Sequence, residues 1–116
     1  MTIGQVIERV RELRPHAFSQ RVILDFINEI EGKVQSEILR LSPQDIIVYT
    51  VEDLERELIV VPPHDVMYVA GVKALLAREL GEWDEYANLS AIFNDMFEGF
   101  LRWHRNTYGF PVSNEE

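Results

Sequence analysis

Apolar side chains recur at steps of three and four residues in four stretches of this sequence, which is the spacing of amphipathic helices. In the first stretch they are Ile3, Val6, Ile7, Val10 and Leu13. Thr2 precedes this run, and Gln5 lies three residues after Thr2, so the two side chains can form a capping box. Pro15 disfavours helical backbone at the residue before it. The pattern therefore predicts a helix over about residues 2–14.

A longer apolar stripe follows, and its members are Ile23, Phe26, Ile27, Ile30, Val34, Ile38 and Leu41. Ser19 suits the N-cap of this helix, and Phe18 is placed to pack on Ile23 as a hydrophobic staple. We expect the helix to cover about residues 19–41. Gly32 lies in its interior, where glycine disfavours helix, and so marks a close crossing or a kink.

The segment over about residues 45–62 has a different pattern. Two short runs, IIVYTV and LIVV, are rich in β-branched and aromatic residues, and the acidic stretch EDLERE separates them. Such runs are typical of strands, and Pro62 and Pro63 end the second one. The pattern favours a two-stranded hairpin with a longer loop. An ordered but irregular crossover is the alternative.

The helical period then returns in Val69, Val72, Leu76 and Leu80. Gly81 suits a left-handed helix end. The last stripe forms one wide face of Tyr86, Leu89, Phe93, Met96, Phe97, Phe100 and His104. We predict helices over about 64–80 and 84–107, with a loose tail over 112–116. The chain of 116 residues is then a single mainly α domain, 1–116, a bundle of about four helices.

A second face of the last helix carries smaller side chains. Its members follow one another at steps of three and four residues and are Ala87, Ala91, Asn94 and Glu98. Small side chains allow another backbone to come close. We expect this flank to pack against a neighbouring helix of the same domain, and a contact with a second subunit is the alternative.

Composition narrows the possible functions. Hydrophobic residues make up 47% of the chain and charged residues 27%, as in a folded protein. The net charge of −9 disfavours direct binding to nucleic acid, which depends on clustered Lys and Arg. The sequence has no Cys, which excludes disulfides, thiolate catalysis and Cys-ligated zinc. It also shows no signal peptide and no apolar run of membrane-spanning length, so we expect a soluble protein that is not secreted.

Few residues are candidates for catalysis or metal binding. His64 beside Asp65 could hold a cation or orient a base, although such a pair at a helix start more often caps the helix. We interpret His16 as a solvated loop histidine and His104 as a partly buried one. Neither Glu-x-x-His nor a nucleophile motif occurs. We therefore expect no catalytic residue, no cofactor, no metal site and no enzyme activity.

Several carboxylates indicate solvent-exposed surfaces of the protein. Glu29 and Glu31 point to different faces of their helix and indicate solvated faces, with Glu29 placed to pair with Lys33. The acidic residues of the predicted hairpin tip are Glu52, Asp53, Glu55 and Glu57. They can keep the tip soluble and prevent edge-to-edge pairing, or they can form a docking patch for a basic partner.

Several stretches together resemble a family of small tailed-bacteriophage and prophage proteins, the head-tail connectors or head-completion adaptors. They are VRELRPHAFS, INEIEGKV, YTVEDLERELIVVPPHDVMYVAGVKA and EYANLSAIFNDMFEGFLRWHR, in order over nearly the whole chain. The more distinctive positions are Val60, Val61, Pro62, Pro63, Asp65 and Tyr68, with Tyr86, Asn88, Ser90, Phe93 and Asn94. The family often has two consecutive asparagines where this chain has Ala87 and Asn88.

The resemblance implies a mostly helical adaptor that forms a homo-oligomeric ring on the phage portal and helps to join capsid and tail. It implies portal and other neck or tail-completion proteins as partners, and the virion neck as location after synthesis in the bacterial cytoplasm. Sequence-specific nucleic-acid binding and membrane binding are not expected. From the residues alone, a bacterial helical module that binds a partner helix on its aromatic stripe is the alternative.

Overall fold

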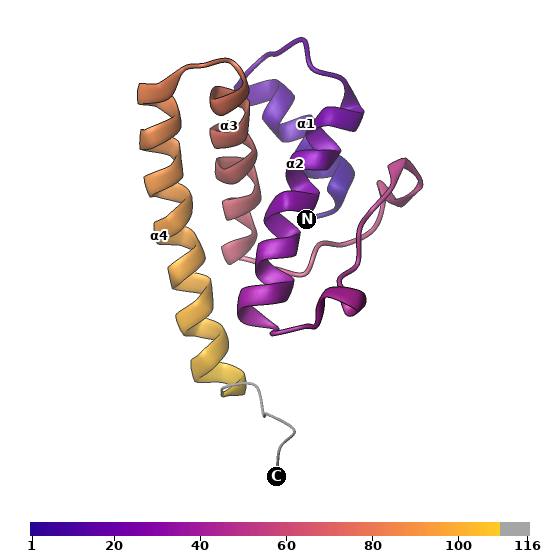
Figure 1. Cartoon of the computed structure of the whole chain (residues 1–116), viewed down its shortest axis with the longest axis vertical. Coiled ribbons are helices and arrows are strands. Elements are labelled where there is room, and N and C mark those ends of the chain that lie inside the picture. The colour runs from indigo at the N-terminus through magenta and orange to yellow at the C-terminus, as the bar shows by residue number, and fades with distance from the viewer. Residues whose placement is uncertain (110–116) are drawn as a thin grey trace.

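The structure is a computed structural model that describes residues 1–109, and this part of the chain is mainly helical (Figure 1). Its long helices are α1 (Ile3–Leu13), α2 (Gln20–Lys33), α3 (Met67–Glu79) and α4 (Trp83–Tyr108). A π-helical segment, Val34–Ile38, continues α2, and 3-10 turns lie at Pro43–Asp45, Val51–Asp53 and His64–Val66. The mainly α prediction with four helices is thereby confirmed. The predicted tail at 112–116 lies outside the described residues.

Three helix ends are formed by the capping residues from which they were predicted, Thr2, Ser19 and Gly81. Thr2 Oγ1 accepts a hydrogen bond from the Gln5 N–H at 3.1 Å, and Gln5 Oε1 accepts one from the Thr2 N–H at 2.8 Å. Ser19 Oγ accepts from the Val22 N–H at 3.3 Å. Gly81 ends α3 with a φ of 72°, in the left-handed region that favours glycine. Capping residues therefore fix three boundaries of the bundle.

The second helix ends earlier than predicted. Its π-helical segment stops at Ile38, and Arg40 takes a φ of 60°. The Leu41 N–H then donates to the Gln35 carbonyl oxygen at 3.0 Å, which closes the helix end. Gly32 is not a close crossing, because a methyl group added there would meet no atom within 4 Å.

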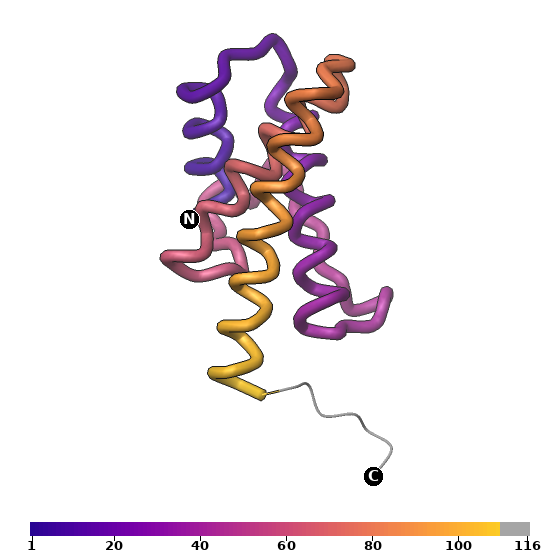
Figure 2. The backbone as a smooth tube through the Cα atoms, turned by 90° about the vertical axis from the view of Figure 1, so that its left-hand side faces the viewer, coloured from indigo at the N-terminus to yellow at the C-terminus, as the bar shows by residue number. Residues whose placement is uncertain are grey.

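The helix α3 lies at the centre of the bundle and contacts α1, α2 and α4. Buried residues occur on all its sides, namely Met67, Tyr68, Ala70, Gly71, Val72, Ala74, Leu75, Leu76 and Ala77. A helix that is apolar all round belongs to a core. The single stripe expected for this segment was therefore too narrow, and Leu80, its last member, is exposed. Figure 2 shows α4 in front of α3, with α1 on one side and α2 on the other.

No hairpin forms in residues 1–109; the segment between α2 and α3 is the irregular alternative. We call residues 39–63 the crossover. The backbone of its first apolar run is hydrogen-bonded to side chains of α2 and of the π-helical segment. Its second run pairs with the start of the chain: the Leu58 N–H donates to the Met1 carbonyl oxygen at 2.9 Å. The amide groups that a hairpin would have paired with each other are thus satisfied elsewhere.

The crossover also completes the start of α1. The Ile3 N–H donates to the Arg56 carbonyl oxygen at 3.1 Å, and the Gly4 N–H donates to the Leu54 carbonyl oxygen at 2.7 Å. These amides belong to the first turn, which lacks partners inside the helix. The only β-type pairing among the described residues is an isolated bridge between Thr2 and Glu57. The crossover and the amino terminus therefore hold each other in place.

Candidate functional site

The aromatic face of α4 packs on α3. Leu89, Phe93, Phe97 and Phe100 are buried. Because α4 packs mainly on α3, a groove opens on each side of it. We call them the α2–α4 groove and the α1–α4 groove.

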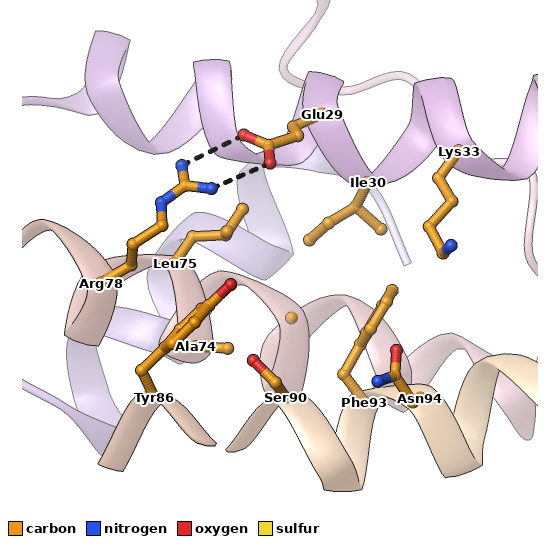
Figure 3. A pocket seen from close by; sticks show the side chains of 11 residues that line it. Glu29, Ile30, Lys33, Ala74, Leu75, Arg78, Tyr86, Ser90, Phe93 and Asn94 are labelled. Carbon is orange, nitrogen blue, oxygen red and sulfur yellow. Dashed lines mark hydrogen bonds and ion pairs between the residues drawn. The ribbon is translucent and has the colours of Figure 1, made fainter. Parts of the chain in front are cut away.

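The α2–α4 groove has an apolar floor and a polar rim (Figure 3). Gly71 of α3 lies in the floor, where a methyl group would come within 2.6 Å of Ile30 Cδ1 and 2.9 Å of Phe93 Cδ1. Only glycine lets the three helices approach this closely. The floor is consequently tight, and the open space of about 230 Å³ lies above it, towards the rim.

Ion pairs close the rim of this groove. Arg78 of α3 donates to both carboxylate oxygens of Glu29 on α2, at 3.1 and 3.3 Å. The hydrogen bond with Glu29, opposed by partial burial, raises the pKa of the Arg78 guanidinium. Lys33 lies 4.6 Å from the centre of the Phe97 ring and donates to both carboxylate oxygens of Glu37 at 3.1 Å. Glu29 therefore pairs across helices with Arg78, and the predicted pair with Lys33 is wrong.

The other polar groups of the α2–α4 groove are Tyr86, Ser90 and Asn94, all on α4. Among the described residues, Ser90 has no histidine or carboxylate hydrogen-bonded to it that could activate its hydroxyl. The groove offers hydrogen-bond donors and acceptors around apolar walls. This arrangement suits binding of a side chain or a segment of a partner.

The α1–α4 groove is more apolar and has a volume of about 310 Å³. Its apolar residues are Met1, Leu13, Val66, Val69, Ala70, Leu89, Ile92 and Met96. Leu13, Val66 and Ile92 are 49%, 52% and 46% exposed, which is high for large apolar side chains gathered in one place. The groove thus gathers exposed apolar side chains from three elements of the chain.

Two basic residues, Arg9 of α1 and Lys73 of α3, complete the lining of the α1–α4 groove. Arg9 donates to Glu12 at 3.3 Å on the solvent side of α1. Lys73 is half-buried, and no hydrogen bond or ion pair is formed by it within residues 1–109. The sequence pattern gave no sign of this groove, because its residues come from three helices and from the start of the chain.

A buried carboxylate lies on the other side of the bundle, under the crossover. Glu31 is fully buried and accepts hydrogen bonds from the hydroxyls of Tyr49 and Tyr68 and from the Ile59 N–H. Burial, followed by the negative charge of Glu31, raises the pKa of both tyrosine hydroxyls far above the usual range. The prediction of a solvated Glu31 is wrong, since the crossover covers that face of α2.

Two side-chain amides hold the first apolar run of the crossover, one from α2 and one from the π-helical segment that continues it. Gln35 accepts from the Ile47 N–H at 2.8 Å and donates to the Ile47 carbonyl oxygen at 3.0 Å. Asn28 does the same for Tyr49, at 2.9 and 3.0 Å. Each amide thus replaces the neighbouring strand that a hairpin would have supplied. The steps of three and four residues between Asn28, Glu31 and Gln35 were the sequence signal for this polar face.

Each of the three histidines lies beside an aromatic ring. His64 lies beside the neighbouring rings of Phe100 and Trp103, at 5.5 and 5.4 Å between centres, while its neighbour Asp65 accepts from the Met1 amino group at 3.1 Å. His104 is half-buried, as predicted, and lies 4.9 Å from the Tyr108 ring.

His16 is half-buried and so differs from the predicted solvated histidine. Its Nδ1 accepts from the Phe18 N–H at 3.1 Å. Burial and the charges of Arg11 and Arg14 lower its pKa. Nowhere in residues 1–109 do three or more His, Asp or Glu side chains gather so as to hold a metal ion.

The structure shows how exposed two predicted surfaces are, the small flank of α4 and the acidic stretch of the crossover. The small flank of α4 is exposed at all its members, Ala87, Ala91, Asn94 and Glu98. The expected packing of this flank on a helix of the same domain is therefore wrong. In the acidic stretch of the crossover, Asp53 Oδ2 accepts a hydrogen bond from the Thr50 N–H at 2.8 Å, whereas Glu52 and Glu55 are exposed.

No helix within residues 1–109 combines the length and the apolar character that crossing a membrane requires. Comparison of the chain with protein-family models, with curated proteins and with solved structures gives no match.

Proposed function

We propose that this protein is a non-catalytic head-tail connector of a tailed bacteriophage or prophage, which forms a ring on the portal and helps to join capsid and tail. The proposal starts from the resemblance of the chain to that family. Its structural support is one observation: the α1–α4 groove gathers three exposed large apolar side chains, Leu13, Val66 and Ile92, in one place. A contact with another protein would bury them.

The shape of the domain suits a ring subunit. The chain measures 50 by 32 by 24 Å, and the last turns of α4 extend beyond the ends of α2 and α3 (Figure 1). The small flank of α4 is free for a partner backbone as well. Head-to-tail contacts between different faces of one subunit generate closed rings when the rotation between copies closes.

The charge of the protein fits passage of DNA through such a ring. The net charge of −9 gives the lumen an average negative surface, along which phosphates would slide without binding. We expect no retention of duplex DNA by the purified protein at moderate salt. Tight binding there would contradict this part of the proposal.

The experiment that tests the function is co-assembly with the portal protein encoded in the same genome. We expect size-exclusion chromatography with light scattering to show a complex containing several copies of this chain for each portal ring. Mass spectrometry of purified virions should also detect the chain. A protein that stays monomeric at high concentration and never binds the portal would overturn the proposal.

A second candidate is a bacterial binding module that takes a partner helix into an exposed groove. The α1–α4 groove favours it too, because apolar walls with basic residues at the rim suit an amphipathic acidic helix. This module would remain monomeric, and it would bind such a peptide while ignoring the portal. The same chromatography therefore separates the two functions.

A further inference from the structure

Lys73 indicates what the α1–α4 groove binds. Lys73 is half-buried in the lining of the groove, and its ammonium group has no carboxylate partner among the described residues. A carboxylate delivered by a bound segment would pair with this ammonium group. The segment that fits therefore carries both apolar side chains and an acidic one.

The chain itself carries such a segment, residues 47–55 of the crossover. Ile47, Val48 and Val51 are 44%, 67% and 49% exposed. Glu52 and Glu55 are exposed beside them, and neither forms an ion pair within the described part of the chain. The segment is thus complementary to the groove in charge and in apolar character.

The two surfaces lie on opposite sides of the bundle. Residues 51–55 project on the side that faces away from α4, whereas the groove borders α4 (Figures 1 and 2). They cannot meet within one copy. One copy can use both at once, giving the segment to one neighbour and the groove to the other, which is the head-to-tail contact of a ring.

The side-chain amides of Asn28 and Gln35 fix the backbone of the segment before it binds. Gln35 and Asn28 hold the backbone of Ile47 and Tyr49 by two hydrogen bonds each. A segment that is already fixed loses little conformational entropy when it binds. Val48 lies between these two clamped residues, so its exposed side chain is held outward.

We infer that residues 47–55 of one subunit dock in the α1–α4 groove of the next, with Glu52 or Glu55 beside Lys73 and Arg9. This contact rests on the proposed function, because it is the subunit contact of the connector ring. It assigns a role to the acidic residues of the crossover and to Lys73.

A charge exchange tests the contact in solutions that contain the portal. We expect Lys73→Glu to weaken the association between copies by at least about tenfold, because it places a carboxylate opposite carboxylates. Glu52→Lys together with Glu55→Lys should do the same. All three changes in one chain should restore much of the assembly, since the pair at position 73 is then reversed at every contact, while Arg9 is unchanged. Arg21→Glu, on an exposed position of α2, is the matched control and should assemble as the wild type does.

A disulfide trap gives a second measurement. The chain has no Cys, so an introduced cysteine is its only thiol. We expect Val48→Cys mixed with Ile92→Cys to give a heterodimer on mild oxidation in the presence of the portal. Val48→Cys mixed with Glu79→Cys should give none, because Glu79 lies at the exposed end of α3.

The outcomes separate this contact from the function on which it rests. If the wild type assembles on the portal while the charge exchange has no effect and no heterodimer is trapped, the contact is wrong and the connector function stands. If the wild type neither assembles nor binds the portal, and no heterodimer is trapped, both are overturned.

Discussion

Tyr68 donates a hydrogen bond from its hydroxyl to the buried carboxylate of Glu31 and so ties the start of α3 to the last turn of α2. The Tyr49 hydroxyl at 2.8 Å and the Ile59 N–H at 2.9 Å add two donors from the crossover. Hydrogen bonds to a carboxylate are about twice as strong as those between neutral groups. Glu31 thus joins three parts of the chain that are far apart in sequence.

Removing this carboxylate should destabilise the fold strongly. Glu31→Ala leaves three donors without an acceptor in a buried place, and each costs about 1–3 kcal/mol. We expect the free energy of unfolding, measured by urea denaturation, to fall by at least about 3 kcal/mol. Glu29→Ala, two residues away, loses an exposed ion pair and should cost less than about 1 kcal/mol. Equal losses for the two variants would contradict the role of Glu31.

The close approach at Gly71 gives a second stability test. Gly71→Ala places a methyl group 2.6 Å from Ile30 Cδ1 and 2.9 Å from Phe93 Cδ1, so one of these side chains has to move. We expect a loss of about 1–3 kcal/mol from overpacking. Gly32→Ala is the matched control, since its methyl group meets nothing within 4 Å inside a helix. It should raise stability by up to about 1 kcal/mol. Thermal unfolding of both variants measures these two changes in stability.

The helices could be predicted from the sequence because their signals are local. Apolar spacing and the caps at Thr2, Ser19 and Gly81 depend on residues within one or two turns. The crossover could not be predicted in this way. Its β-branched residues indicate extended backbone, but they do not say whether the partner is a strand or the side chains of a helix.

The candidate site was the least predictable part. Lys73 belongs to a groove whose walls come from α1, α3 and α4, and only the packing of these helices brings the walls together. Glu31 looked solvated because helix periodicity does not reveal which face a distant segment covers. Ala87 and Ala91 looked covered because small side chains allow close packing, yet no described part of the chain lies on them.

His16 should make stability depend on pH. Burial and the charges of Arg11 and Arg14 lower its pKa below the ordinary value of 6.5. As the pH falls below that value, the unfolded chain binds a proton before the folded chain does, so the folded state loses stability until the lower folded pKa is passed. His16→Asn keeps an acceptor for the Phe18 N–H but cannot titrate.

We therefore expect the wild type to lose more stability than His16→Asn as the pH falls below about 6.5, with urea midpoints as the measure. Arg11→Gln is the second variant of this test. It removes one of the charges that disfavour the protonated ring, so the decrease with falling pH should be smaller than in the wild type. A decrease that is identical in all three proteins would exclude His16 as its source.

The amide clamps predict a specific pattern of hydrogen exchange. The Ile47 and Tyr49 amides donate to Gln35 and Asn28 and should exchange slowly, whereas the Val48 amide between them has no such acceptor and should exchange fast. Gln35→Ala should speed exchange at Ile47 by about tenfold or more while Tyr49 stays protected, because each clamp is a separate side chain. Asn28→Ala should reverse the two effects. Heteronuclear NMR resolves the three amides, and equal acceleration of Ile47 and Tyr49 in both variants would show that the run opens as one unit, with no independent clamps.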